Sequence, residues 1–163
     1  MEKEVNNEGS QYPSVELAYE FVKPSYDWLQ NRLDAVNSRI EFLLTFVSSV
    51  TVAAPIFVRA LFSDIGFGSL WFKAAVVVFV LSAIVGIIGR IYSGLKLISP
   101  QKLYDEWLSW SEWEFKKNVL YWAGQHFKYN ASLVNRKANF AIVMSLLLVA
   151  EIVFIVLWVA VSR

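Results

Sequence analysis

Residues 138–162 read ANFAIVMSLLLVAEIVFIVLWVAVS, an almost entirely apolar run that lies between Lys137 and Arg163. About 20 apolar residues in a helix cross the roughly 30 Å of hydrocarbon in a bilayer. Residues 40–58 and 70–92 form two further runs of sufficient length. Backbone groups in hydrocarbon must be paired within their own segment, so each run is expected to be a helix. We therefore predict an all-α integral membrane protein with three transmembrane helices.

The composition agrees with a bilayer as the solvent. The chain has 163 residues, of which 56% are hydrophobic, and its mean hydropathy is +0.45. A net charge of +1 gives no basic field that would attract nucleic acid. Cysteine is absent, which excludes disulfides and thiol nucleophiles. The polar start, MEKEVNNEGS at residues 1–10, lacks the basic and apolar regions of a cleavable signal peptide, so we expect none.

The three predicted spans divide the rest of the chain into three segments. Residues 1–39 and 93–137 are expected to form helical segments outside the bilayer, and residues 59–69 a short loop. Helical seam spacing precedes the first span, with apolar residues at Leu29, Leu33, Val36, Ile40 and Leu43. This spacing predicts one helix that continues into the span. A separate short helix at 15–22 is expected to end at Pro24, with Ser25 capping the next helix.

The basic residues are distributed unevenly around these spans. An odd number of spans places 1–39 and 93–137 on one side of the bilayer and the loop 59–69 on the other. Twelve of the 15 Lys and Arg residues fall on or border the first side. Because cytoplasmic loops carry the excess of Lys and Arg, we predict a multi-pass membrane protein with a cytoplasmic N-terminus and an outer C-terminus. Trp71 and Trp158 are then expected at the outer interface, where indole rings prefer to lie.

One acidic residue, Glu151, lies near the middle of the third predicted span. A charge there costs about 2.5 to 3.5 kcal/mol on insertion scales, which the surrounding apolar side chains outweigh. Glu151 is therefore either a proton, cation or oligomer site, or a structural residue that is protonated or hydrogen-bonded. Four hydroxyl residues are candidate partners in the second case: Thr45, Ser48, Ser49 and Ser82.

A stripe of small residues follows one face of the second predicted span. Its members are Ser82, Gly86, Gly89 and Ser93, at spacings of four, three and four. Such a stripe lets helix backbones approach closely. We expect these four residues to pack against another helix, either within one chain or between chains.

Tryptophan and basic residues gather in and beside the segment 93–137. We single out six of them as candidate contacts for a ligand or for lipid headgroups: Trp107, Trp110, Lys116, Lys117, Arg136 and Lys137. Indole rings suit both headgroups and nucleotide bases. The alternative is that the aromatic side chains simply pack against the other helical segment outside the bilayer.

No pattern in the sequence indicates catalysis. A nucleophile with its base, a phosphate-binding glycine loop and a cluster of metal ligands are all missing from the motifs that we find. We therefore expect no enzyme, no catalytic residue, no cofactor and no metal. The expected partner is membrane lipid, and no DNA or RNA partner is expected.

Three helices of one chain cannot enclose an aqueous pore, so conduction would require a homo-oligomer. The first functional hypothesis is an oligomeric membrane effector that perturbs the bilayer or opens a pore on a cytoplasmic signal. The second is a non-conducting scaffold or assembly factor. The third is a small ion or proton transporter that uses Glu151 directly.

Three short motifs carry a resemblance to a known family. They are LDAVNSR at residues 33–39, LLTF at residues 43–46, and the pair Arg136-Lys137 before the last span. In this layout the chain resembles small membrane effectors of bacterial antiphage nucleotide-signalling systems, including the Pycsar transmembrane effectors. The resemblance implies a membrane protein that impairs the inner membrane during phage infection on a nucleotide signal. It transfers no nucleotide-binding residue to this sequence.

Overall fold

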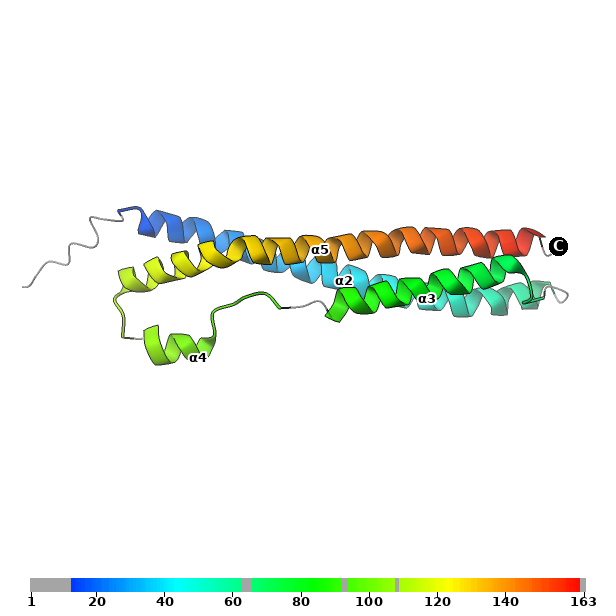
Figure 1. Cartoon of the computed structure of the whole chain (residues 1–163), viewed down its shortest axis with the longest axis horizontal. Coiled ribbons are helices and arrows are strands. Elements are labelled where there is room, and N and C mark those ends of the chain that lie inside the picture. Colours follow the sequence, from blue (N-terminus) through cyan, green and yellow to red (C-terminus); the bar gives the residue numbers. More distant parts are fainter. Residues whose placement is uncertain (1–12, 63–65, 92–93, 108, 162–163) are drawn as a thin grey trace, which may run out of the picture. The chain divides into compact units, whose positions relative to one another are not determined.

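The computed structural model describes residues 13–62, 66–91, 94–107 and 109–161, and every regular element in these ranges is helical (Figure 1). The elements are α2 (Val15–Leu61), α3 (Leu70–Ile91), α4 (Pro100–Lys102), the π-helix η1 (Leu103–Trp107) and α5 (Glu112–Val161). Three of them, α2, α3 and α5, are long and apolar enough to cross a membrane. The all-α prediction with three membrane-crossing helices is confirmed. Tyr92 and Ser162, at the ends of two predicted spans, lie outside the described residues.

The helix α2 runs without interruption through Pro24, so the predicted break at this residue is wrong. Proline lacks the N–H that would bond the carbonyl four residues earlier, and its ring crowds the preceding turn. Here the Pro24 side chain is exposed, so that the crowding falls on the outer face of the helix. Ser25 caps no helix, and its hydroxyl donates instead to the Phe21 carbonyl at 3.1 Å. The predicted seam beyond it is confirmed, since Leu29, Ile40 and Leu43 are buried.

The chain divides into two compact units. Unit 1 comprises Met1–Arg32 and Gly94–Leu133, and unit 2 comprises Leu33–Ser93 and Val134–Arg163. The three apolar stretches belong to unit 2. Both α2 and α5 contribute residues to each unit.

The core of unit 2 is formed by all three long helices. Ile40 and Leu43 of α2 pack with Ala141 and Met144 of α5, and Val85 of α3 lies against this cluster. Gly86 allows the close approach, because a β-carbon at this position would lie 2.5 Å from Leu44 Cδ2.

Trp158 closes this core near the end of α5. The Trp158 ring is fully enclosed, stacks against Phe67 and packs beside Phe72, and its Nε1–H donates to the Gly66 carbonyl at 3.2 Å. Trp158 therefore links the end of α5 to the loop between α2 and α3. The position of Trp71 and Trp158 at the outer interface stays a prediction. Trp71 remains partly exposed and stacks on Phe154.

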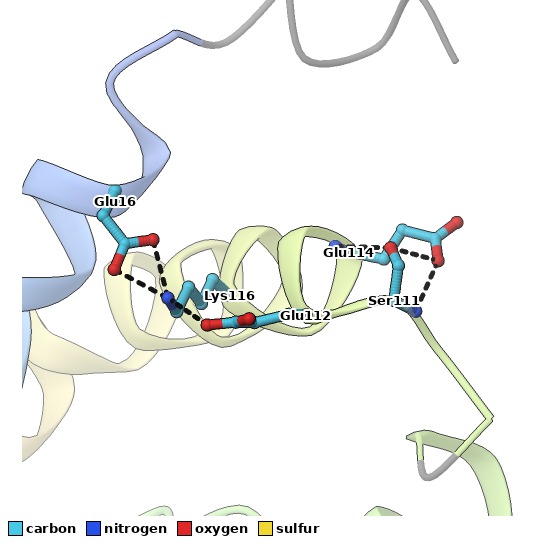
Figure 2. A network of polar contacts seen from close by, with 5 residues as sticks. All are labelled: Glu16, Ser111, Glu112, Glu114 and Lys116. Atoms are coloured by element: carbon cyan, nitrogen blue, oxygen red, sulfur yellow. Dashed lines mark hydrogen bonds and ion pairs between the residues drawn. The ribbon is translucent and has the colours of Figure 1, made fainter. Parts of the chain in front are cut away.

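In unit 1, the first turn of α5 is fixed by a capping box. The Ser111 N–H and hydroxyl donate to a Glu114 carboxylate oxygen at 2.9 and 2.8 Å, and the Glu114 N–H donates to Ser111 Oγ at 3.3 Å (Figure 2). These bonds satisfy donors that the start of a helix otherwise leaves free. They also lower the pKa of Glu114, because they favour its charged form.

Candidate functional site

The buried face of α5 repeats every seven residues and includes polar members. Its buried positions at this interval are Ala123, Asn130, Lys137, Met144, Glu151 and Trp158. A seven-residue repeat keeps one face of a helix turned toward its neighbours. Each buried polar member has a partner on another part of its own unit, and these partners define the candidate sites.

Asn130 joins α5 to the segment before α4 in unit 1. Its side-chain oxygen accepts from the Lys96 N–H at 2.9 Å, and its amide donates to the Lys96 carbonyl at 3.1 Å. A fully buried amide that makes both bonds holds the backbone at this point.

Glu151 is enclosed within unit 2, with no exposed surface. The Thr51 hydroxyl of α2 donates to Glu151 Oε1, and Thr51 Oγ1 also lies 2.9 Å from the Val47 carbonyl. The sequence did not point to Thr51. Three of the candidate hydroxyls, Thr45, Ser48 and Ser49, are exposed and donate to carbonyls of their own helix.

The fourth candidate, Ser82, is also fully buried, and among the described residues neither Ser82 Oγ nor Glu151 Oε2 has a hydrogen-bond partner. The glycines next to Ser82 pack within the same chain. A β-carbon on Gly86 would meet Leu44 and Met144, and one on Gly89 would meet Phe140 and Ile40. Ser93, the last member of the predicted stripe, lies outside the described residues.

Lys137 lies at a small charged cavity of unit 2. The cavity has a volume of about 220 Å³ and is lined by Asn37, Ile40, Glu41, Arg90 and Lys137. Lys137 is 1% exposed, and its Nζ donates to Asn37 Oδ1 at 2.8 Å. Burial lowers the pKa of this ammonium. Arg90 Nη2 lies 3.2 Å from Glu41 Oε1 in an exposed ion pair.

Unit 1 contains a larger cavity, of about 350 Å³, which the sequence did not indicate. It lies between α2, α5 and the segment before α4, and its lining includes Tyr19, Lys23, Tyr26, Leu97 and Trp122. The Tyr26 hydroxyl donates to the Ala123 carbonyl at 2.7 Å, and burial raises the pKa of Tyr26. The Tyr26 and Trp122 rings are 6.3 Å apart. Aromatic residues at helical spacing on 15–28 and 115–129 are a sequence signal for two sides of this cavity. The residues of the third side, Leu97 and Ile98, follow no periodic pattern.

The tryptophans that we singled out in the sequence pack together within unit 1. Trp107 is buried and stacks on Trp110 at a centroid distance of 5.0 Å, and the edge of Phe115 meets it.

The basic residues beside these tryptophans are engaged as well. Lys116 Nζ lies 2.6 Å from a Glu16 oxygen and 2.7 Å from a Glu112 oxygen (Figure 2). The hydrogen bonds that the Lys116 ammonium donates to Glu112 and to Glu16 raise the pKa of Lys116, and the bond to Glu112 has the larger effect. The ammonium of Lys117 lies over the Trp113 ring at 5.0 Å. Arg136 is exposed. Of the six candidate contact residues, Arg136 and Lys137 belong to unit 2, and unit 1 contains Trp107, Trp110, Lys116 and Lys117.

These features define an all-α, multi-pass membrane protein with a second helical unit that contains a ligand-sized cavity. No family model, no curated protein and no solved structure matches the chain.

Proposed function

We propose that the protein is a ligand-responsive membrane effector, which assembles as a homo-oligomer and permeabilises the bacterial inner membrane. The observation that carries this proposal is the cavity of unit 1. Its walls include residues of α2 and α5, the two helices that also supply unit 2. A ligand that shifts these helices in unit 1 therefore acts on the same helices that cross the bilayer.

The lining of the cavity suits a small planar ligand with an anionic group. Pockets for small molecules have volumes of about 300 to 1,000 Å³ and combine apolar walls with few polar groups. This cavity offers the Trp122 and Tyr26 rings for stacking. Its charged lining residues are Lys23 and Asp27, of which the Lys23 ammonium can pair with an anion. A nucleotide has both a base that stacks on aromatic rings and a phosphate. The resemblance to antiphage effectors supports the same ligand class.

Permeabilisation requires several copies, because three helices of one chain cannot enclose water. Large apolar side chains remain exposed on all three helices of unit 2, including Phe46, Ile84 and Leu146. These surfaces face lipid in the monomer and are free to contact further copies. With the N-terminus in the cytoplasm, the cavity of unit 1 receives a cytoplasmic signal during phage infection.

Release of a trapped dye from liposomes tests the proposal. The purified protein is reconstituted at a fixed ratio of protein to lipid, and 3′,5′-cyclic mononucleotides are added one at a time. We expect one of them to accelerate release, and Trp122→Ala to abolish the acceleration. Tyr121→Ala is the matched control, since Tyr121 is an exposed aromatic residue of α5 next to Trp122 and lies outside this cavity. Release that no nucleotide changes, from a protein that remains monomeric, would contradict the effector function.

Proton conduction is the second candidate function. It is favoured by the unpartnered Glu151 Oε2 and Ser82 Oγ inside unit 2. Glu151→Gln separates the candidates, because it keeps the shape of the side chain and removes the proton site. Proton flux that disappears while dye release persists would support conduction. If both persist, Glu151 is structural, and if neither occurs in the unchanged protein, the scaffold function gains support.

A further inference from the structure

Lys137 is a buried cation without an anionic partner. Its ammonium has three N–H donors, and one of them is used by Asn37. Among the described residues no carboxylate forms an ion pair with Lys137. Buried charges in proteins are normally paired, because removing a charge from water is costly. Two N–H donors of the ammonium remain beyond the bond to Asn37, and Lys137 lines a cavity from which a further acceptor can approach them.

The cavity beside Lys137 has the charge that an anion requires. Arg90 and Lys137 contribute two positive charges to its lining, and Glu41 contributes one negative charge. The Glu41 carboxylate is already paired with Arg90 at 3.2 Å, so the cavity retains a net charge of +1. The arginine fork has five N–H donors, and most of them stay available when one oxygen of Glu41 is bound.

The position of this cavity along the helices selects the source of the anion. Ile40 begins the first apolar stretch, Arg90 lies two residues before the end of the second, and Lys137 immediately precedes the third. All three boundaries meet at one cavity within unit 2. The level at which apolar stretches end is the level of lipid headgroups, and basic pockets between membrane helices at this depth suit anionic headgroups.

The volume of the cavity also favours a lipid headgroup as the source of the anion. At about 220 Å³ the cavity is smaller than typical sites for whole small molecules, which measure about 300 to 1,000 Å³. A lipid phosphate needs only its headgroup to enter, since its acyl chains remain in the bilayer. We propose that this cavity binds the phosphate group of an anionic phospholipid, with Lys137 and Arg90 as its donors.

Thermal unfolding in a neutral detergent tests the site. Phosphatidylglycerol, phosphatidylcholine and inorganic phosphate are added separately, since a ligand that binds only the folded state raises the midpoint. We expect phosphatidylglycerol to raise the midpoint and the other two to leave it nearly unchanged. Equal stabilisation by phosphatidylcholine would overturn the selectivity for an anionic lipid. Equal stabilisation by inorganic phosphate would overturn the lipid as the source.

Three variants and one control test whether stabilisation by phosphatidylglycerol depends on the cavity at Lys137. Lys137→Met and Arg90→Gln should each weaken phosphatidylglycerol binding about tenfold, the usual effect of losing a charged hydrogen bond. Glu41→Gln should strengthen binding, because it removes the competing negative charge. Lys73→Met is the control, since Lys73 is an exposed lysine outside the cavity.

The Arg90 variant decides the outcome if Lys137→Met does not fold, because the Arg90 side chain is 67% exposed and is not needed for packing. A phosphatidylglycerol shift that survives Arg90→Gln unchanged would exclude the proposed site. Weaker binding in Glu41→Gln would exclude it as well.

Discussion

Gly86 of α3 has no room for a side chain. A β-carbon here would lie 2.5 Å from Leu44 Cδ2 and 2.8 Å from the Cε of Met144, which is fully buried. Gly86→Ala must therefore displace these side chains, and we expect it to lower stability by about 1 to 3 kcal/mol. Gly124 of α5 is exposed with nothing near its added β-carbon, so Gly124→Ala should stabilise by about 0.5 to 1 kcal/mol. Unfolding in detergent measures both, and shifts of the same sign would contradict this account.

The buried Glu151 depends on a single hydroxyl. Thr51→Val keeps the shape of the side chain but removes the donor to Oε1, which leaves both carboxyl oxygens without a partner. We expect a loss of about 1 to 3 kcal/mol in unfolding free energy, the usual cost of a buried unsatisfied group. Thr45→Val is the control, because the Thr45 hydroxyl is exposed and donates to the Glu41 backbone carbonyl of the same helix. The double change Thr51→Val with Glu151→Leu should recover stability, and a further loss in that variant would argue against the interaction.

At the scale of the element, the start of α5 should respond to pH through its capping box. The hydrogen bonds from Ser111 hold the pKa of Glu114 below its ordinary value of 4.5. A lowered carboxyl pKa stabilises the folded turn fully above pH 4.5, and this contribution is lost as the pH falls through the lower folded value. We expect the amide protection of the first turn of α5 to fall in that window. Ser111→Ala should remove this pH dependence, and Ser109→Ala, outside the box, should retain it.

The seam of α2 could be predicted from the sequence, but the buried face of α5 could not. Along α2 the seam residues are all apolar, so that their spacing is visible as a hydrophobic pattern. Along α5 the seven-residue repeat includes Asn130, Lys137 and Glu151, which a search for apolar residues misses. Their partners Lys96, Asn37 and Thr51 are distant in sequence and are identified only by the fold. The prediction of a break at Pro24 was wrong because α2 continues through this residue, with the proline ring exposed, although proline locally disfavours a helix interior.

At the scale of the whole molecule, the apolar stretches predicted the number of membrane helices because hydrocarbon admits few alternatives. The cavity of unit 1 was not predictable in this way. Leu97 and Ile98 line this cavity and belong to a segment without regular secondary structure. Such a segment has no sequence periodicity from which its contacts could be predicted. Length and hydropathy therefore establish the membrane part, whereas the ligand site depends on tertiary contacts.

Three spans predict that the two termini lie on opposite sides of the membrane, and the distribution of basic residues predicts a cytoplasmic N-terminus. We expect a fluorescent protein fused before Met1 to be fluorescent in the cytoplasm, and alkaline phosphatase fused after Arg163 to be active in the periplasm. The same reporters on the opposite ends are the controls and should be silent. Two ends in one compartment would refute the three-span arrangement. Inverted ends would refute the orientation and, with it, a cytoplasmic signal for the cavity of unit 1. The proposed lipid site at Lys137 does not depend on which side of the membrane it faces, so that proposal would stand.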